Sequence, residues 1–451
     1  MSKLPNHSEL LDMHKLSIDS YTGVGGFYDK TYLNKFKAEE DSDFQDRFDN
    51  VSYQNQIKGI IDSITKPVWA NEITRTGASN YEEAFINDAT GNGTSLSQFL
   101  EETGTYHNIS DNVFIIMDNF NVTGENEQED LENRLFPFVY FKTYDEVHSY
   151  ELDVFGNVLE ISFEYRTIEV EGNTKIVYRH IDAAEQYDYY LEDKVKIQVS
   201  VPVPHSIGVP PVIMTGNKVA NIPPIFSLAS LAKVGYNQFS ELRNLEVRQG
   251  FSILVLPGID NNTSTEIGAG CILGVPDHIN QSPAYIAPDS NISKTIMESI
   301  EKTMQTITEM GKQQGAIPVM DSSKSGAAYS YEFVGASFQL TSLGKLYQND
   351  VEVRIFNLFN KFLGNDSSTI EISYDMNYTP GKTQLEESNK YLIQAMGLHI
   401  SETANKEYTK AYVSNVNNLA QIVMDDKTLR TIAAEIDASM PKAPEEEKTE
   451  N

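Results

Sequence analysis

The sequence predicts an α+β fold in which long amphipathic helices accompany a separate antiparallel β region. Two helices of nearly equal length, over residues 225–249 and 291–317, flank a short β-rich insert. Between residues 112 and 204, runs of β-branched and aromatic residues are separated by turn signals, as in antiparallel strands. A third helical stretch, Tyr331 to Leu363, lacks proline and would be about 50 Å long at 1.5 Å per residue.

The two flanking helices are sharply bounded. Pro223 and Pro224 precede the first and Gly250 follows it. Asp289 or Ser290 can cap the second, which Gly315 and Pro318 end. Apolar residues recur in both at steps of three and four, which keeps one face apolar. The two series are Leu228, Leu231, Gly235, Phe239, Leu242 and Leu245, and Ile292, Ile296, Ile300, Met304, Ile307 and Met310.

Each helix would be about 35 Å long, so the chain is expected to run out along one and back along the other. The insert, residues 250–290, then forms a small β-rich domain at their far ends. Because a single copy would leave the apolar stripe exposed, we expect neighbouring copies of the chain to cover it.

The remaining segments are less regular. Residues 1–27 are expected to be flexible, and a helical pattern runs from Tyr28 to Trp69, with Pro67 ending it. Short helices and loops are expected over residues 70–107, followed by about five strands from residue 112 onward.

Beyond the second flanking helix, a loop of small residues is expected at 318–330. Residues 331–384 hold the long helix and one strand, 385–438 are helical, and 439–451 form a charged, disordered tail.

The charge is strongly acidic: 65 Asp and Glu residues against 35 Lys and Arg residues give a formal net charge of −30. This balance argues against tight DNA binding, which concentrates cations. It is compatible with an ordinary acidic surface, and also with a conduit whose acidic wall keeps a polyanion mobile. Cys271 is the only cysteine, which excludes an intrachain disulfide and a multi-cysteine zinc site.

No apolar run reaches the 18 or so residues that span a bilayer, and the N-terminus lacks the apolar core of a signal peptide. We therefore expect the protein to be located in a cytoplasm or in an assembled particle. The eight His residues include no pair at metal-ligand helical spacing, and no cofactor motif is found, so neither metal nor cofactor is expected.

The order of these elements resembles phage portal proteins, in particular the compact portals of tailed phages, from about residue 30 to residue 435. The resemblance rests on co-linearity and on four phrases: "YLNKFKAEEDSDFQDRFDNVSYQNQIKGIIDSITKPVW", "ELDVFGNVLEISFEYRT", "HSIGVPPVIMTGN" and "YLIQAMGLHISETANKEY". It implies a portal fold, whose parts have names in that family. Residues 28–224 would be the wing, 225–249 and 291–317 the two-helix stem, 250–290 the clip, 318–330 the tunnel loop, 331–384 the long wing helix and strand, and 385–438 the helical crown.

The resemblance also implies a function and partners. Portal proteins are not enzymes; about twelve copies form a ring at one capsid vertex of the virion. The terminase large subunit pumps double-stranded DNA through the ring during packaging, and DNA later leaves by it. Other implied partners are the major capsid or scaffolding protein and a head-completion or adaptor protein, with assembly in the host cytoplasm.

Two groups of residues are candidates for facing DNA. The tunnel loop contributes Asp321, Ser322, Ser323, Lys324 and Ser325. Basic residues of the stem are candidate channel-lining residues: Lys233, Arg243, Arg248, Lys294 and Lys302. Glutamates interleave with them at helical spacing, however, and surface ion pairs are the interpretation that this pattern favours.

Two other functions stay open. Another virion structural protein, such as a minor head or adaptor component, would share the acidity. An enzyme would have to use Gly381-Lys382-Thr383, which follows a strand as a nucleotide-binding loop does. Such a loop needs a glycine where this chain has Met376, and Pro380 removes a donor N–H, so a turn before a helix is the favoured interpretation.

Overall fold

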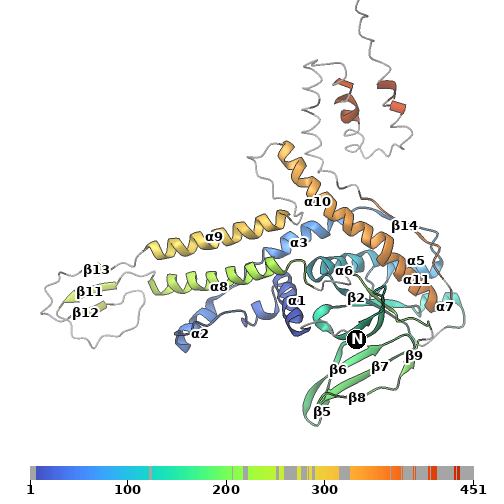
Figure 1. The fold of residues 1–451 in the computed structure, drawn as a ribbon, viewed down its shortest axis with the longest axis horizontal. Coiled ribbons are helices and arrows are strands. Elements are labelled where there is room, and N and C mark those ends of the chain that lie inside the picture. Colours follow the sequence, from blue (N-terminus) through green and yellow to red (C-terminus); the bar gives the residue numbers. More distant parts are fainter. Residues whose placement is uncertain are drawn as a thin grey trace, which may run out of the picture. The chain divides into compact units, whose positions relative to one another are not determined.

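The structure is a computed structural model and describes residues 7–120, 124–205, 207–216, 222–249, 253–257, 272–275, 282, 284–286, 290–313, 326–365, 367–376, 378, 390, 392, 405–406, 408–413, 431–432 and 434–436 (Figure 1). The chain divides into two compact units. The first comprises Met1–Pro318 and Gly335–Met376, and the second comprises Val319–Val334 and Asn377–Asn451. Helices and antiparallel sheets together confirm the predicted α+β class.

The first unit begins with a buried helix, α1 (His7–Thr22), and a 3-10 turn, η1 (Gly25–Phe27). The prediction that residues 1–27 are flexible is therefore wrong for residues 7–27, the part of this segment that the structure describes. Ser17 and Ser20 are fully buried and interrupt the apolar period that would have indicated a helix. Their hydroxyls donate to the backbone carbonyls four residues earlier, at 2.8 and 2.7 Å, so these polar side chains are satisfied inside the helix.

The helical pattern predicted from Tyr28 to Trp69 divides into three helices. Pro67 begins one of them rather than ending a helix, at a position where its missing N–H costs nothing. Two further helices begin with complete capping boxes, Ser79 with Glu82 and Ser95 with Gln98. The elements of this region are α2 (Asp41–Asn50), α3 (Ile57–Thr65), α4 (Pro67–Ala70), β1 (Ile73–Thr76), α5 (Asn80–Asn87) and α6 (Leu96–Ser110).

The β region forms two sheets. A three-stranded antiparallel sheet has the order β10-β2-β3, and a six-stranded sheet has the order β4-β5-β6-β7-β8, with β9 also paired to β7. The strands are β2 (Val113–Asp118), β3 (Phe138–Thr143), β4 (Val147–Leu152), β5 (Val158–Val170), β6 (Asn173–Ile181), β7 (Glu185–Glu192), β8 (Val195–Gln198), β9 (Val203–Pro204) and β10 (Val212–Met214), with α7 (Glu127–Glu132) and η2 (Tyr144–Glu146) between them.

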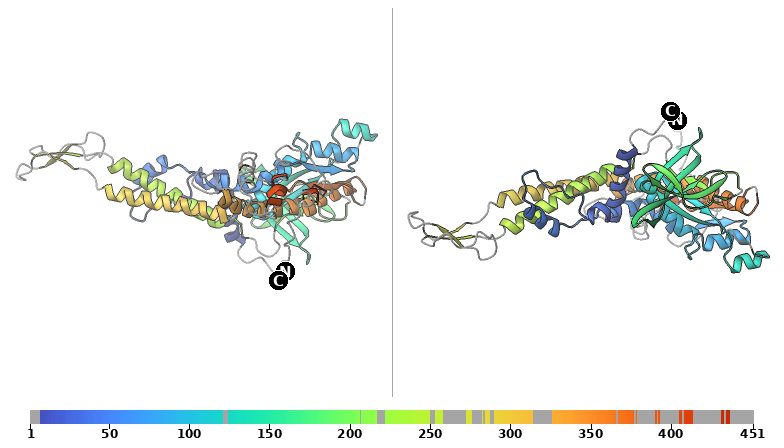
Figure 2. Two further views of the ribbon diagram at one scale, coloured as in Figure 1. Left: turned by 90° about the horizontal axis from the view of Figure 1, so that it is seen from above. Right: turned by 90° about the horizontal axis from the view of Figure 1, so that it is seen from below.

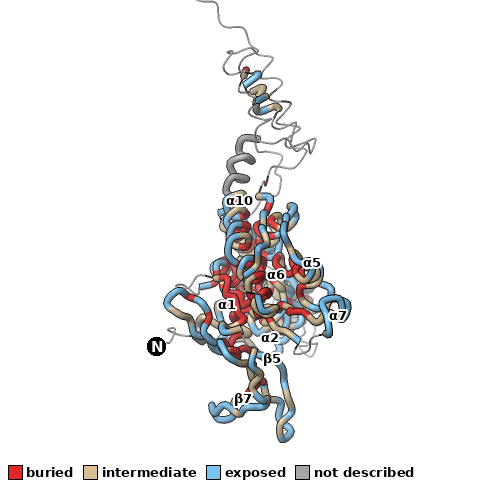
Figure 3. The backbone as a smooth tube through the Cα atoms, turned by 90° about the vertical axis from the view of Figure 1, so that its right-hand side faces the viewer, coloured by how far each residue is buried: buried red, intermediate tan, exposed pale blue. Residues whose placement is uncertain are grey.

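The prediction of about five strands was thus too low for the described residues, which hold nine in this region. Strands as short as β9 and β10 carry too few residues to show an alternating pattern. The two sheets share an apolar core that includes Phe114, Ile161, Phe163 and Ile181. Buried residues gather around α1 and α6 in Figure 3.

The two predicted flanking helices are confirmed as α8 (Phe226–Gln249) and α9 (Ser290–Gln313). They lie side by side in both views of Figure 2 and contact each other along their length. Cover from other copies of the chain is not needed where the helix pair meets the N-terminal helices, whereas Ile292 at the other end of the stripe is 48% exposed, and its cover by other copies stays a prediction. Leu228 and Ala232 of α8 and Ile307 of α9 are buried against Tyr21, Ile57, Ile61, Ile64 and Ile109 of the N-terminal helices α1, α3 and α6.

Between α8 and α9 the chain forms a small three-stranded sheet of β11 (Ile253–Pro257), β12 (Ile272–Val275) and β13 (Ala284–Ile286). The central strand β11 pairs in parallel with β12 and antiparallel with β13. Because β11 begins just after α8 ends and β13 ends just before α9 begins, this sheet is tied to one end of the helix pair.

The long helix predicted from Tyr331 to Leu363 is interrupted by one π-helical turn. α10 (Gly326–Leu346), η3 (Tyr347–Val351) and α11 (Glu352–Phe362) follow one another without a break. Residues 326–330, predicted as loop, are helical. Strand β14 (Glu371–Tyr374) then pairs antiparallel with β1, which attaches the end of the first unit to its N-terminal helices.

The second unit is described only in part. Residues 408–413 are helical, within the region 385–438 that the sequence predicts as helices. The remainder of that region, residues 318–325 and the tail 439–451 lie almost wholly outside the described residues.

Candidate functional site

The pair of helices α8 and α9 is the part of the predicted site that the structure describes best. Gly235 of α8 faces Met304 of α9 so closely that a Cβ at Gly235 would lie 2.8 Å from the Met304 Cε. One turn further along α8, the Gln238 Oε1 accepts from the Thr303 Oγ1 and its Nε2 donates to the Ser299 Oγ, both at 3.0 Å. Apolar and polar contacts together therefore fix the spacing of the two helices.

Hydrogen bonds hold α8 to residues 28–50, two of them partly buried and one buried. The Asn237 Oδ1 accepts from the Asn34 N–H at 2.8 Å, and its Nδ2 donates to the Tyr32 carbonyl at 3.1 Å. The Arg47 Nη1 donates to the Ser240 Oγ at 3.3 Å. α8 is thus anchored by groups whose partners lie in the first fifty residues.

The five basic residues predicted for the channel wall have different environments. The Lys233 ammonium lies 4.7 Å from the centre of the Tyr32 ring, so it packs on the chain's own N-terminal part. Arg243 pairs with Glu246 on α8 at 3.1 Å, which agrees with the predicted surface ion pairs. Lys294 and Lys302 are exposed on α9, and the side chain of Arg248 lies outside the described part.

The helix pair is close to electrically neutral although the chain carries −30. The two helices carry six basic and five acidic residues. The basic residues are Lys233, Arg243, Arg248, Lys294, Lys302 and Lys312, and the acidic ones are Glu241, Glu246, Glu298, Glu301 and Glu309. Burial raises the pKa of Glu241, which shifts this carboxyl toward its neutral form. The pair therefore differs in charge from the acidic chain that carries it.

The other predicted site residues cannot be placed. The five candidates of the loop lie outside the described residues: Asp321, Ser322, Ser323, Lys324 and Ser325. The same holds for Gly381, Lys382 and Thr383.

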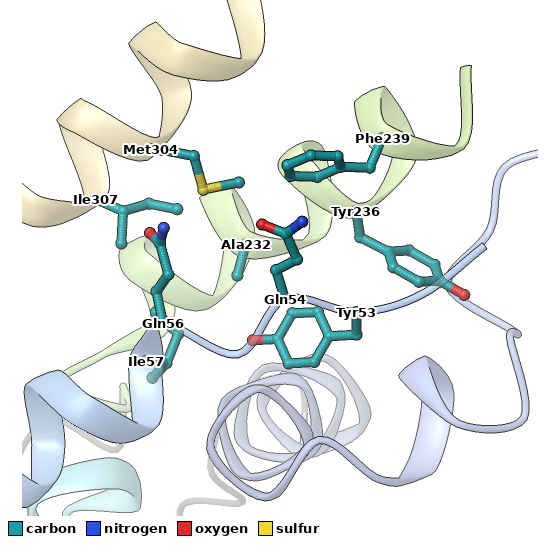
Figure 4. A pocket seen from close by; sticks show the side chains of 9 residues that line it. All are labelled: Tyr53, Gln54, Gln56, Ile57, Ala232, Tyr236, Phe239, Met304 and Ile307. Carbon is teal, nitrogen blue, oxygen red and sulfur yellow. The ribbon is translucent and has the colours of Figure 1, made fainter. Parts of the chain in front are cut away.

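A small hollow lies between α8, α9 and the segment that leads into α3 (Figure 4). Tyr53, Gln54, Tyr236, Phe239 and Met304 are among the residues that line it. Its volume, about 10 Å³, is roughly that needed for one water molecule. Ligand pockets are of the order of 300 Å³ or more, so this hollow belongs to the packing of the helix pair.

The structure also brings together a serine, a histidine and an aspartate that sequence reasoning missed. The Ser162 Oγ lies 3.0 Å from the His180 Nδ1, and the His180 Nε2 lies 3.8 Å from the Asp182 Oδ2. Ser162 is only 2% exposed, so its hydroxyl is not open to a substrate. Burial also lowers the pKa of His180. Only the pairing register of β5 with β6 places Ser162 opposite His180, and the sequence does not reveal that register.

None of the described helices combines the length and apolarity needed to cross a membrane. Within the part of the chain that the structure describes, no group of three or more His, Cys, Asp or Glu side chains is placed to hold a metal ion. Comparison of the sequence with protein-family models and with curated proteins finds no match.

Proposed function

We propose that this chain is a portal protein of a tailed bacteriophage. About twelve copies would form a ring at one capsid vertex, through which double-stranded DNA passes without sequence specificity during terminase-driven packaging and later ejection. The ring would also be the attachment point for head-tail connector proteins.

One observation carries the proposal: two antiparallel helices, each of 24 residues, bear a small sheet at one end and pack on the α+β unit at the other. The long helix α10–α11 follows them in the chain, as the resemblance implies. In this proposal α8 and α9 are the stem, β11–β13 the clip and residues 318–325 the tunnel loop.

The charge of the helix pair supports the same proposal. A conduit wall that attracted phosphates strongly would hold the DNA, because each neutralised phosphate adds affinity. Six basic residues offset by five acidic ones give a wall with little net attraction or repulsion. Lys294 and Lys302 are exposed on α9, and in this proposal they are among the residues that meet DNA.

Native mass spectrometry and negative-stain electron microscopy of the purified protein test the assembly. We expect closed rings of about twelve copies with a central hole. Single copies alone, at concentrations up to tens of micromolar, would overturn the proposal. A stoichiometry of one or two copies would favour a minor head or adaptor component instead.

A photo-crosslinking residue at position 324 tests the conduit directly, in particles stalled during packaging. We expect an adduct with DNA at position 324 and none at position 174, an exposed residue of β6 that serves as the control. Equal adducts at both positions, or none at 324 in filled particles, would contradict a loop that faces the channel.

A further inference from the structure

The six-stranded sheet has two open edges that match each other. On one side, β4 pairs with β5 only between Val158 and Phe163, so no described strand covers the outer edge of β5 from Tyr165 to Val170. On the other side, β8 pairs with β7, and no described strand covers its outer edge. We call these the β5 edge and the β8 edge (Figure 1).

Exposed apolar side chains accompany both edges. Val195 and Val199 of the β8 segment are 62% and 40% exposed, and Tyr165 of the β5 edge is 43% exposed. Uncovered strand edges with apolar side chains are templates for pairing with another strand.

The charges of the two edges are opposite. Glu169 and Glu171 lie on the β5 edge or at the turn that follows it, and Lys194 and Lys196 lie on β8 or just before it, where Asp193 of the same turn offsets one of the two lysines. The Lys196 ammonium lies 4.7 Å from the centre of the Tyr189 ring. Arg166, the one cation of the β5 edge, is directed at Asp188 on β7, 3.5 Å away. Pairing β8 with β8, or β5 with β5, would place like charges opposite one another, which destabilises a sheet. Pairing β8 with β5 places opposite charges together.

The strand directions favour the same contact. All ladders from β5 to β8 are antiparallel, so β5 and β8 run in opposite directions. A second copy placed beside the first in the same orientation would therefore set its β5 antiparallel to the first copy's β8. The sheet would continue without a change of ladder type.

We infer that the β8 edge of one copy pairs with the β5 edge of the next, and that this contact joins neighbouring subunits. It is head-to-tail, because different surfaces meet, and such contacts generate rings when the rotation closes. The inference rests on the proposed ring, since it names one contact within it.

Disulfide trapping tests this contact. Cys271 is the only cysteine, so a Cys271→Ser background is free of thiols. Within one copy, β5 and β8 are separated by two strands and lie about 14 Å apart, too far for a disulfide. A bridge between them must therefore join two copies.

The variants combine Thr167→Cys with Lys196→Cys, Ile197→Cys or Gln198→Cys, and are oxidised after assembly. We expect at least one pair to give a ladder that continues past the dimer on a non-reducing gel. Ile176→Cys, similarly exposed but on the interior strand β6, replaces Thr167→Cys in the control and should give no ladder.

Charge reversal gives a second readout. Lys194→Glu with Lys196→Glu, or Glu169→Lys with Glu171→Lys, should each raise the concentration needed for assembly at least tenfold. Combining all four substitutions should restore it. Circular dichroism of the variants shows whether each still folds.

Two outcomes separate this inference from the proposed function. If the wild-type protein forms rings but no pair gives a ladder, or the ladder stops at the dimer, the edge contact is wrong while the ring stands. The lysines and the β-bulge near Glu164 would then be devices that keep the edges unpaired. If the wild-type protein forms no ring at all, both fail.

Discussion

The buried side chain of Arg47 contacts both Ser240 of α8 and the carboxylate of Glu39. Its side chain is 1% exposed and binds Glu39, itself 7% exposed, through two hydrogen bonds of 2.6 and 2.9 Å. Removing one member of a buried ion pair leaves the other charge without compensation. We expect Arg47→Ala to lower the free energy of unfolding by about 3–5 kcal/mol, measured by urea denaturation.

A matched double variant distinguishes charge from packing. Arg47→Met with Glu39→Leu removes both charges and should recover much of the lost stability, because apolar replacements avoid the desolvation of the ions. Lys35→Ala is the control, since Lys35 and Asp41 form an exposed pair and should contribute little. Equal losses in the Arg47 and Lys35 variants would contradict a special role for Arg47.

The same ion pair predicts a pH dependence. The hydrogen bonds from Arg47 hold the pKa of Glu39 below its ordinary value of 4.5. A lowered pKa in the folded state stabilises the protein above the unfolded-state pKa, and this contribution is lost as the pH falls through the folded-state pKa. We therefore expect Glu39→Gln to destabilise the protein at pH 7 and the difference from wild type to shrink below pH 4.5.

Urea midpoints of both proteins between pH 3 and 7 give this difference directly. Comparing the two proteins removes the contribution of the other titrating groups, among them Glu102 and Asp118, whose pKa values burial raises. A difference that stays constant over the whole range would mean that Glu39 is not stabilised as a carboxylate.

At the scale of single elements, two glycines in helices should respond oppositely to alanine. A Cβ on Gly59 of α3 would meet nothing within 4 Å, whereas a Cβ on Gly104 of α6 would lie 2.1 Å from the Trp69 ring. Alanine favours helix over glycine by about 1 kcal/mol, so Gly59→Ala should raise stability by that amount. Gly104→Ala should lower it by about 1–3 kcal/mol, because the rigid indole must move.

Thermal unfolding of the two variants beside wild type checks this contrast. Trp69 is the only tryptophan, so its fluorescence reports on the disturbance at Gly104 without interference. Stabilisation by both substitutions would show that the indole moves aside at no cost.

The sequence predicted the elements whose signals are local. The bounds of α8 follow from the proline pair before it, and the periodic apolar residues of α8 and α9 define their faces. α1 was missed because Ser17 and Ser20 stand where apolar residues would be expected, and only the tertiary structure shows that they are buried. What covers the buried part of the apolar stripe was likewise invisible, since α1, α3 and α6 are distant in sequence from α8.

In the candidate site, too, the sequence revealed the local features but not the contacts between distant residues. The sequence indicated the helices and the interleaved charges, of which the Arg243–Glu246 pair is observed. It could not show that Lys233 packs on Tyr32, because that contact joins residues two hundred positions apart. The two open sheet edges were hidden for a similar reason: an edge is defined by strand order, which depends on pairing between distant segments.

At the scale of the whole molecule, the net charge should control assembly. Each copy carries −30, so copies brought together in the proposed ring would repel one another at long range. Salt shortens the range of this repulsion, with a Debye length of about 30 Å at 0.01 M and about 8 Å at 0.15 M. The apolar and backbone contacts of the inferred edge pairing would act at much shorter range and would be screened far less. We therefore expect the assembled fraction to rise as sodium chloride increases from 0.01 to about 0.15 M, measured by sedimentation velocity at fixed protein concentration.

The charge-reversal variants sharpen this salt experiment. Lys194→Glu with Lys196→Glu makes each copy more negative and removes the attraction at the β8 edge, so it should need more salt than wild type to assemble. Glu169→Lys with Glu171→Lys also breaks the edge pairing but makes each copy less negative. It should therefore assemble at a lower salt concentration than Lys194→Glu with Lys196→Glu. Sucrose at matched osmolarity is the control, because it leaves the Debye length unchanged. An assembled fraction that falls steadily with salt would show that attraction between charges, and not the relief of repulsion, holds the copies together.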